Sequence, residues 1–301
     1  MTHRPAILVC LSVCVPRRQA GRVEKALAAA GTPAAQWRAA GDPSVRFDLY
    51  LTSPREAGRV RLALAGHLRA AGVPDGWIIR RRTLAPEDWA NSWKRFFHAQ
   101  QVSPRVVVAP SWEAARAPRG GCVVSVDPGM SFGTGQHATT RGCLELLDEA
   151  AGGARRSFLD VGCGSGILAI AAARLGFRRV AAIDCDPDAV GIARENARRN
   201  RVGARIRFAA ADLAAFRPGR GYDVVAANLT ARPLREGAAA LAAAVSKNPA
   251  ARLILSGMRD RQWSQVRPAF ARRGLREAGR RRREGWTTVC LVRAGRADRV
   301  S

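Results

Sequence analysis

The sequence predicts an α/β protein in which a doubly wound parallel sheet follows a smaller α+β domain. Short apolar runs alternate with helix-like segments along most of the 301 residues. In the second part these runs are almost continuously apolar, which is typical of parallel strands buried on both faces. One run leads into a glycine cluster, "DVGCGSG" at 160–166, which opens a helix-like segment. These three observations favour an α/β fold with a ligand site at one sheet edge.

The first 84 residues carry the pattern of a split βαβ domain. Val45, Phe47, Leu49 and Leu51 alternate with polar residues, as expected for a half-buried strand. Pro54 stands where a helix would start. The predicted elements, in order, are a strand at 6–15, a helix at 19–31, a short strand at 35–39, a strand at 44–53, a helix at 54–72 and a strand at 77–84. This order, β-α-β-β-α-β, predicts a ferredoxin-like sandwich.

A segment rich in aromatic residues joins the two parts. In "APEDWANSWKRFFHAQQ" at 85–101, a helix would place Trp89, Trp93, Phe96 and Phe97 on one face. We interpret it as a linker helix held against a domain surface, and the alternative is a gripping surface for a protein substrate. The predicted organisation is therefore 1–84, 85–101 and 102–301.

The third segment has the alternating order of strands and helices that is typical of a doubly wound domain. Its predicted strands lie within "RRSFLDVG" (155–162), "RRVAAID" (178–184), "ARIRFAAAD" (204–212), "YDVVAANL" (222–229) and "ARLILSG" (251–257). Turns rich in Gly and Asp and helix-like segments follow them. Residues 275–293 predict a terminal hairpin with a Gly/Arg turn.

The chain is strongly basic. It contains 50 Lys and Arg residues and 24 Asp and Glu residues, which gives a net charge of +26. Such a charge favours polyanionic partners through long-range steering. Because nearly all the basic residues are arginines spread along the chain, a compositional bias explains the charge equally well, and both interpretations stay open.

Cysteine use and hydropathy predict a cytoplasmic protein. The seven cysteines form no C-x-x-C pair and the four histidines stand apart, so we expect no metal site. The apolar run at 6–15 is too short to span a bilayer. "PRR" follows it where a leader's cleavage site needs small residues. We expect buried thiols in a reducing compartment and no membrane contact.

The glycine turn selects a ligand class. Gly162, Gly164 and Gly166 let the backbone approach a ligand closely. A dinucleotide turn would need glycine at 167, where the chain has isoleucine. The carboxylate of Asp160 ahead of the turn suits a ligand with an ammonium group better than a pyrophosphate. This combination points to S-adenosylmethionine as the cofactor.

Two further aspartates follow predicted strands. Asp184 ends the second strand, where a carboxylate can accept hydrogen bonds from a ribose diol. Asp186 precedes Pro187 and predicts a helix cap. Asp212 ends the third strand and could meet an adenine amino group, and a solvated turn residue is the alternative.

Asn228, in "AANLTARPL", is the candidate catalytic residue. It ends the fourth strand, at the edge where open α/β sheets bind ligands. Its amide could hold a methyl acceptor's N–H so that the lone pair points at the donated methyl. The alternative is a cap for the helix that begins near Ala231.

These motifs together resemble one family. "DPGMSFGTGQHATT" (127–140), "LDVGCGSGILAIAA", "AIDCDPDAV", "DVVAANLTARPL" and "LILSGM" look like the bacterial methyltransferases of large-subunit ribosomal protein eleven, the PrmA family. The resemblance covers about 85–293. It implies a Rossmann-like, seven-stranded class I methyltransferase domain behind a ferredoxin-like domain that recognises the substrate. It also implies methylation of α-amino and lysine ε-amino groups of that ribosomal protein.

The resemblance also assigns site residues. The positions that match the family's donor contacts are Thr140, Gly162, Asp184 and Asn228. The loop ahead of Thr140 would cover the donor. The loop's candidate contacts are Phe132, Gly133 and Thr134, with Phe132 shielding the sulfonium. His137 is either a general base or, in our preferred interpretation, a residue that holds the loop.

Three departures from the family pattern concern the acceptor rather than the donor. Arg232 stands where the family usually has glycine, Ala138 stands where proline is usual, and the N-terminal domain is rich in arginine. The alternatives are therefore another protein lysine or an RNA base as acceptor, or a non-catalytic module that binds ribosomal RNA. We expect a monomer with weak contact to ribosomal RNA through its basic surface.

Overall fold

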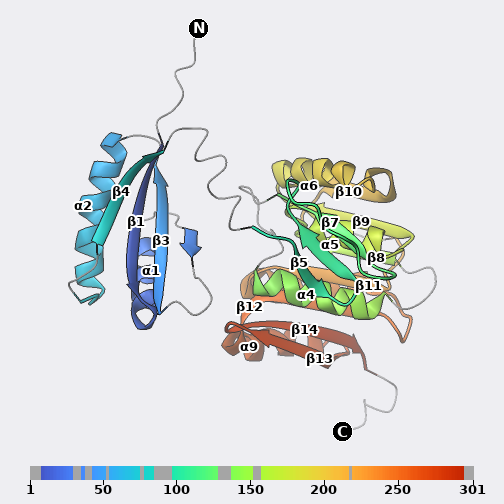
Figure 1. Ribbon diagram of the computed structural model, residues 1–301. Helices are drawn as coiled ribbons and strands as arrows, with labels where there is room; N and C mark the ends of the chain where they lie inside the picture. The colour runs from blue at the N-terminus through green and yellow to red at the C-terminus, as the bar shows by residue number, and fades with distance from the viewer. Residues whose placement is uncertain are drawn as a thin grey trace. The chain divides into compact units, whose positions relative to one another are not determined.

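The computed structural model describes residues 8–29, 35–37, 43–51, 54–74, 78–84, 97–127, 137–151, 157–216 and 219–294. The chain divides into two compact units, residues 1–96 and 97–301 (Figure 1). None of the helices in these ranges is long and apolar enough to cross a membrane.

The smaller unit is the predicted split βαβ sandwich. Its elements are β1 (Leu8–Pro16), α1 (Ala20–Ala29), β2 (Ala35–Trp37), β3 (Ser44–Leu51), α2 (Pro54–Ala70) and β4 (Ile78–Leu84). The antiparallel sheet has the order β2-β3-β1-β4. Val45, Phe47, Leu49 and Leu51 are buried in one core with apolar residues of α1 and α2, so the alternation in the sequence is confirmed.

The predicted linker helix is wrong at its carboxyl end. Residues 97–99 have no regular structure, and strand β5 (Gln100–Ser103) begins inside the predicted helix. The strand forms because Gln100 and Gln101 pair with β6 (Val106–Ala109), which continues into a parallel pair with β7 (Cys122–Ser125). This three-stranded sheet was not predicted from the sequence. Residues 85–96, which include Trp89, Trp93 and Phe96, lie outside the described ranges.

The larger unit is built on a seven-stranded sheet with the order β10-β9-β8-β11-β12-β14-β13. Strands β8 (Ser157–Val161), β9 (Arg179–Asp184), β10 (Ile206–Ala210), β11 (Val224–Asn228) and β12 (Arg252–Arg259) are parallel. The predicted hairpin is confirmed as β13 (Leu275–Arg283) and β14 (Trp286–Arg293), and β14 pairs antiparallel to β12. Glu284 and Gly285, both with positive φ, form its tight turn.

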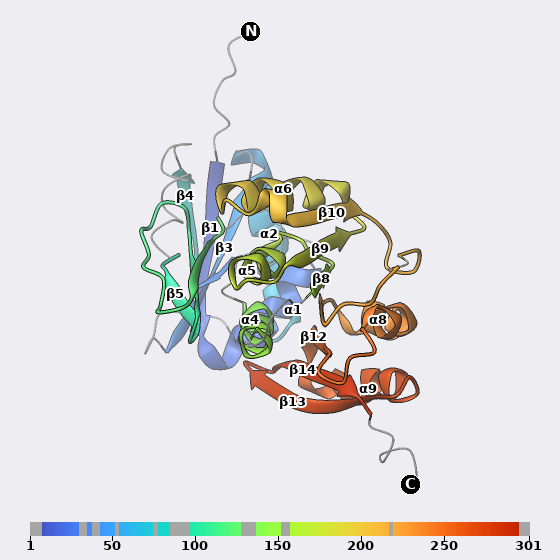
Figure 2. The same ribbon diagram turned by 90° about the vertical axis from the view of Figure 1, so that its right-hand side faces the viewer.

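Helices cover both faces of this sheet (Figure 2). Helices α4 (Ala138–Ala150), α5 (Ile167–Arg174) and α6 (Pro187–Arg199) share a core with Phe158, while α8 (Ala238–Ala244) and α9 (Trp263–Ala271) share one with Leu159. Phe158 and Leu159 are neighbours and point to opposite faces. The short helix α7 (Ala231–Glu236) precedes α8.

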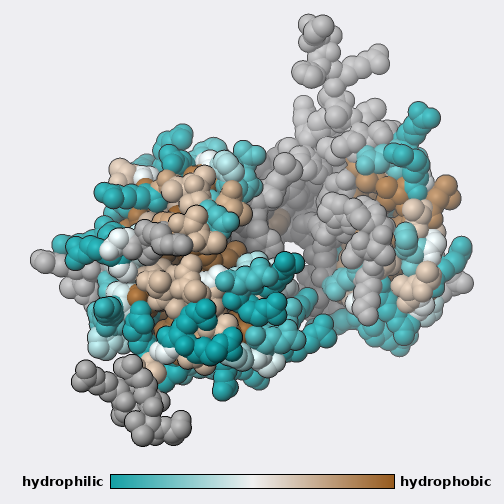
Figure 3. Space-filling model, turned by 180° about the vertical axis from the view of Figure 1, so that it is seen from behind, coloured by the Kyte–Doolittle hydropathy of each residue, from teal (hydrophilic) through white to brown (hydrophobic). Residues whose placement is uncertain are grey.

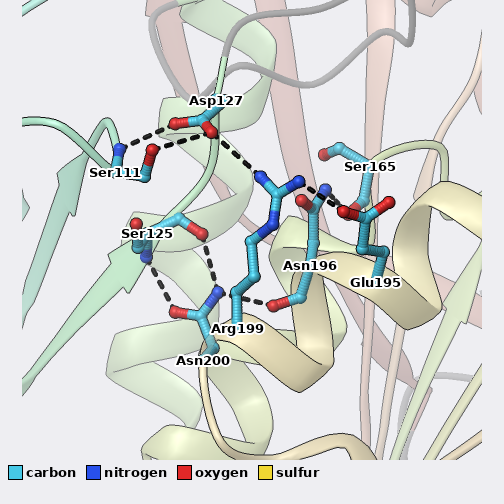
Figure 4. Close-up of polar contacts among 8 residues, drawn as sticks. All are labelled: Ser111, Ser125, Asp127, Ser165, Glu195, Asn196, Arg199 and Asn200. Atoms are coloured by element: carbon cyan, nitrogen blue, oxygen red, sulfur yellow. Dashed lines mark hydrogen bonds and ion pairs between the residues drawn. The ribbon is translucent and has the colours of Figure 1, made fainter.

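The end of α6 ties three segments of the larger unit together (Figure 4). Asn200 accepts a hydrogen bond from the backbone N–H of Ser125 and donates one to its carbonyl. Arg199 donates to Asp127, which also accepts from Ser111. Asn196 donates to the carbonyl of Ser165 in the glycine turn. One helix thus fixes both the end of β7 and the glycine turn.

Gly142 allows the close approach of α4 to the sheet, so we predict that Gly142→Ala destabilises the fold. A Cβ at this position would lie 2.4 Å from Thr288 Oγ1 in β14. The overpacking should cost about 1–3 kcal/mol, despite the better helix propensity of alanine. Urea unfolding measures the change.

The matched control is Gly191→Ala in α6, where a new Cβ would meet nothing within 4 Å. It should stabilise the protein by about 0.5–1 kcal/mol. Equal effects of the two substitutions would contradict the packing argument.

Candidate functional site

A cavity of about 1090 Å³ lies at the carboxyl ends of the parallel strands. Strands β8, β9, β10 and β11 end at it because they run in the same direction, and the order of the chain reverses between β8 and β11. Predicted site residues that line it are Thr140, Asp160, Gly162, Gly164, Asp184, Asp212 and Asn228. The structure therefore brings together side chains that are far apart in the sequence.

The glycine turn is fixed by hydrogen bonds from its own backbone. The N–H groups of Gly162 and Cys163 donate to the carbonyl of Ile183, and the N–H of Gly164 donates to Asp184 Oδ2 at 2.9 Å. Gly162 has a φ of +68°, and a Cβ there would lie 2.4 Å from Leu229 Cδ2. The turn is thus held close to the ends of β9 and β11.

Gly166 does not line the cavity, unlike its neighbours in the predicted set. It caps α5 with a φ of +77°, and a Cβ there would lie 2.9 Å from the Cβ of Ala193 in α6. This glycine serves the packing of α5 against α6.

Asp160 is a buried carboxyl at the base of the cavity. It is 1% exposed, and its Oδ2 accepts a hydrogen bond from the N–H of Ala169 at 3.0 Å. Ala169 lies in the first turn of α5, where N–H groups have no partner within the helix. Burial raises the pKa of Asp160 to about 7, and this hydrogen bond opposes the rise. A cation placed beside the carboxyl would favour its ionised form.

Asp184 lies at the cavity, whereas Asp186 caps a helix. Asp184 lines the cavity, and its Oδ1 accepts from the N–H of Asp186 at 3.1 Å. Asp186 caps α6 by accepting from the N–H of Asp188, so the predicted helix cap is confirmed. Asp212 is exposed in its turn, accepts from the N–H of Ala214 and lines the cavity, so it is a turn residue, and its contact with an adenine amino group stays a prediction.

Asn228 and Thr140 meet across the cavity. The Asn228 Nδ2 lies 3.5 Å from Thr140 Oγ1. Asn228 Oδ1 is buried and has no hydrogen-bond partner among the described residues. Helix α7 begins at Ala231 after Thr230, which excludes Asn228 as its cap. The described part of the fold therefore leaves this oxygen available as a hydrogen-bond acceptor.

His137 holds a helix end. It caps α4, and its Nδ1 lies 2.7 Å from Thr139 Oγ1. Burial lowers the pKa of its imidazole, so the neutral form is favoured near pH 7. Its ring packs edge-on against Trp286 at 4.8 Å, and Arg259 stacks over Trp286 at 4.0 Å. This geometry supports the interpretation of His137 as a structural residue.

The loop ahead of His137 falls on residues 128–136, outside the described ranges. The expected contacts of Phe132, Gly133 and Thr134 therefore stay predictions. The strand end before the loop is anchored by Asp127, which accepts hydrogen bonds from Ser111 and Arg199.

Sequence reasoning missed several residues of the cavity wall. Trp286 starts β14 and lines the cavity, although it is more than 100 residues from the glycine turn. Ala239, Ala240 and Ala243 of α8 and Phe216 supply an apolar wall. Figure 3 shows apolar residues gathered in the middle of one face of the larger unit, with hydrophilic residues around them. The one local signal was the tryptophan in an otherwise Arg-rich hairpin.

The comparison of the sequence with known families decides the assignment. The profile of the ribosomal protein L11 methyltransferase (PrmA) family matches residues 65–294. The chain belongs to this family. A ribosomal protein L11 methyltransferase of Geobacter metallireducens is 43% identical over 214 residues, which are 71% of this chain and 68% of the relative. That of Symbiobacterium thermophilum is 37% identical over 257 residues, which are 84% of this chain and 83% of the relative.

A solved structure of the PrmA family agrees in fold. The ribosomal protein L11 methylase from Lactobacillus delbrueckii subsp. bulgaricus superposes with a TM-score of 0.60 at 28% identity. The match covers 66% of this chain and all of that chain. The predicted seven-stranded methyltransferase fold is thus confirmed.

We predict that Asp160 makes stability depend on pH. The folded carboxyl holds its proton up to a pKa of about 7, whereas the unfolded one loses it near 3.8. The contribution of Asp160 to stability is complete below about pH 4 and is lost as the pH rises towards 7, by a few kcal/mol in total. The wild type should therefore lose stability relative to Asp160→Asn over this range.

Urea unfolding of the ligand-free protein at several pH values measures this difference. Asp186→Asn is the control, because asparagine caps helices about as well as aspartate. A difference between wild type and Asp160→Asn that does not vary with pH would show that the carboxyl is not perturbed.

Proposed function

We propose that this protein is an S-adenosylmethionine-dependent N-methyltransferase that methylates amino groups of ribosomal protein L11. The observation that carries the proposal is the buried, unpaired Oδ1 of Asn228 in a cavity at the switch point of the sheet. A buried acceptor without a partner is costly in a folded protein. An N–H of the acceptor amine would satisfy it.

The cavity fits the donor chemically. Asp160 offers a carboxylate for the ammonium of the methionine part, which would favour the ionised form of this carboxyl. Asp184 is placed for the ribose hydroxyls, and Asp212 for the adenine amino group. The glycine turn at Gly162 and Gly164 allows the backbone to approach the ligand.

In this proposal the donor supplies an electrophilic methyl group on a sulfonium. Asn228 orients the reaction by accepting an N–H of the neutral amine, so that the nitrogen lone pair points towards the methyl. Thr140 Oγ1 keeps the Asn228 amide in its rotamer through the 3.5 Å contact with Nδ2. The new bond joins nitrogen and methyl carbon, the carbon–sulfur bond breaks, and the extra proton leaves to water.

No strong base is needed in this scheme. Amines of this class have pKa values of about 8 to 10. A weakly polar site favours the neutral amine, and water can take the proton before the attack. His137 is engaged with Thr139 and caps α4, so we assign it a positioning role.

The proposed acceptor follows from the names of the two relatives reported above, both ribosomal protein L11 methyltransferases. We propose lysine ε-amino and α-amino groups as targets, the smaller unit as the part that recognises the protein, and a monomer in the cytoplasm as the working form. Arg232, which departs from the family pattern, is 81% exposed and pairs with Glu236 at 2.8 Å. Arg232 does not line the cavity itself, but Glu236 does, so the pair lies at the rim, where an acceptor would approach.

The test is to incubate the purified protein with labelled S-adenosylmethionine and unmodified ribosomal proteins, and to resolve the products by mass. Label on amines of L11 would support the proposal. Label on another protein or on RNA would replace the substrate. Donor binding without any label would favour a non-catalytic module.

We predict that Asn228→Ala and Asp184→Ala separate turnover from donor binding. Loss of the Asn228 amide should lower kcat about 100-fold. Donor affinity should change less than about tenfold, as for one neutral hydrogen bond. Loss of the Asp184 carboxylate should weaken donor binding about 10- to 100-fold. Calorimetry gives the donor Kd, and methyl transfer gives kcat.

Asn248→Ala is the matched control, because Asn248 is exposed, does not line the cavity, and hydrogen-bonds to Ala250 and Asp223 at the opposite end of the strands. It should leave both quantities unchanged. Full activity of Asn228→Ala would remove Asn228 from the reaction.

A further inference from the structure

Charges are divided between the two edges of the large sheet. The described segments that follow β8, β9, β10 and β11 contain no Lys or Arg, and they form the wall of the cavity. The described residues that lead into or begin β9, β10, β11 and β12 include seven basic ones, which are Arg178, Arg179, Arg201, Arg205, Arg220, Lys247 and Arg252. The one acidic residue in the same segments is Asp223.

This division argues against a purely compositional origin of the charge. A bias towards arginine codons would place arginines at both edges. The carboxyl edge carries Arg259 and Arg261 at the end of β12, but the described turns after β8, β9, β10 and β11 carry none. The parallel strands bring the starts of β9, β10, β11 and β12 to one edge. The seven side chains therefore gather on one surface, which we call the basic edge.

The positive charge of the basic edge is not neutralised by the fold. None of the seven side chains makes an ion pair with a described residue. Asp223 is already satisfied by hydrogen bonds from Ser157 and Ser246. By contrast, arginines of β13 pair with acidic residues, as Arg281 does with Glu149 and Arg283 with Glu145.

A groove extends this surface around the edge strand. Helix α6 lies along β10 (Figure 2), and a groove of about 700 Å³ between them is lined by Arg194, Arg198 and Arg207. Arg194 is held in place by the carbonyl of Phe208 at 2.8 Å. Arg198 and Arg207 form no ion pair with a described residue, so their guanidinium groups are free for a phosphate.

We propose that the basic edge and this groove form an RNA-binding surface, separate from the methyl-donor cavity. Guanidinium groups match phosphate oxygens in two-point hydrogen bonds, which favours a phosphate backbone. A membrane surface would also need apolar anchors. The large apolar side chains exposed in the described part of the chain are Leu62, in the smaller unit, and Ile192, which is 37% exposed.

RNA is chosen among the polyanions because the relatives' named substrate is a ribosomal protein, which belongs to a particle built on RNA. The amines that receive methyl groups are themselves cationic before they lose a proton. The basic edge would repel them rather than hold them. It lies at the opposite end of the strands from the cavity, so bound RNA leaves the cavity open.

The test measures binding of the full chain to a labelled RNA duplex of about 16 base pairs by fluorescence anisotropy, over a series of salt concentrations. The variant R178Q/R201Q/R220Q/K247Q removes four charges from the basic edge. The control R59Q/R61Q/R235Q/R261Q removes four exposed charges elsewhere. Neither set lines the cavity, so donor binding should persist in both and report intact folding.

We expect the first variant to bind RNA at least about tenfold more weakly at ~0.1 M salt, with a salt slope smaller by roughly 3 to 4. The control should change both quantities much less. Equal losses in the two variants would show an effect of net charge alone and would overturn the proposal. Unchanged RNA binding would also overturn the proposal. If the melting temperature of the variant fell at the same time, the charges would serve only to stabilise the negative C-terminal ends of helices.

Two further probes separate the polyanions. Tighter binding to a DNA duplex of equal length, or to vesicles with anionic lipids, would also overturn the assignment to RNA. These results do not depend on methyl transfer, so failure of this proposal is distinct from failure of the proposed reaction.

Discussion

The parallel pairing of β8 with both β9 and β11 is the constraint on which the rest of the site depends. Asp160, Asp184 and Asn228 lie in or at the ends of these three strands. Pairing in one direction brings them to one edge without any contact among the side chains themselves. The backbone pairing therefore carries the geometry, and the side chains are free to serve a ligand.

The same constraint separates two surfaces. The parallel strands β8 to β11 present their carboxyl ends to the cavity and begin at the opposite edge of the sheet. The described turns after these strands carry aspartates and no Lys or Arg, whereas the residues of the basic edge lie where β9 to β12 begin. One sheet can thus carry a cavity with acidic side chains and, about one strand length away, a basic surface that attracts anions.

The sequence predicts well what depends on local pattern. The alternation of Val45, Phe47 and Leu49 and the cap at Asp186 are features of a few neighbouring residues, and the structure confirms both. The end of the predicted linker helix is wrong because the pairing of Gln100 with β6 is a non-local interaction that outweighs the local helical pattern.

The site shows the same division. Asp160, Asp184 and Asn228 could be placed because each follows a recognisable strand. Gly166 lies beside glycines that line the cavity, and only the packing of α5 against Ala193 of α6 reveals its separate use. The alanines of α8 and Trp286 join the wall only through tertiary folding, and of these only the tryptophan stands out in its local sequence.

The two-residue turn at Glu284 and Gly285 gives the terminal hairpin an influence on the distant cavity. The turn sets the register in which Arg283 faces Trp286. Successive residues of a strand point to opposite faces, so a shift by one residue would replace the indole in the cavity wall with a threonine side chain. The length of a surface turn far from the glycine turn in the sequence therefore helps to decide which side chain completes the cavity wall.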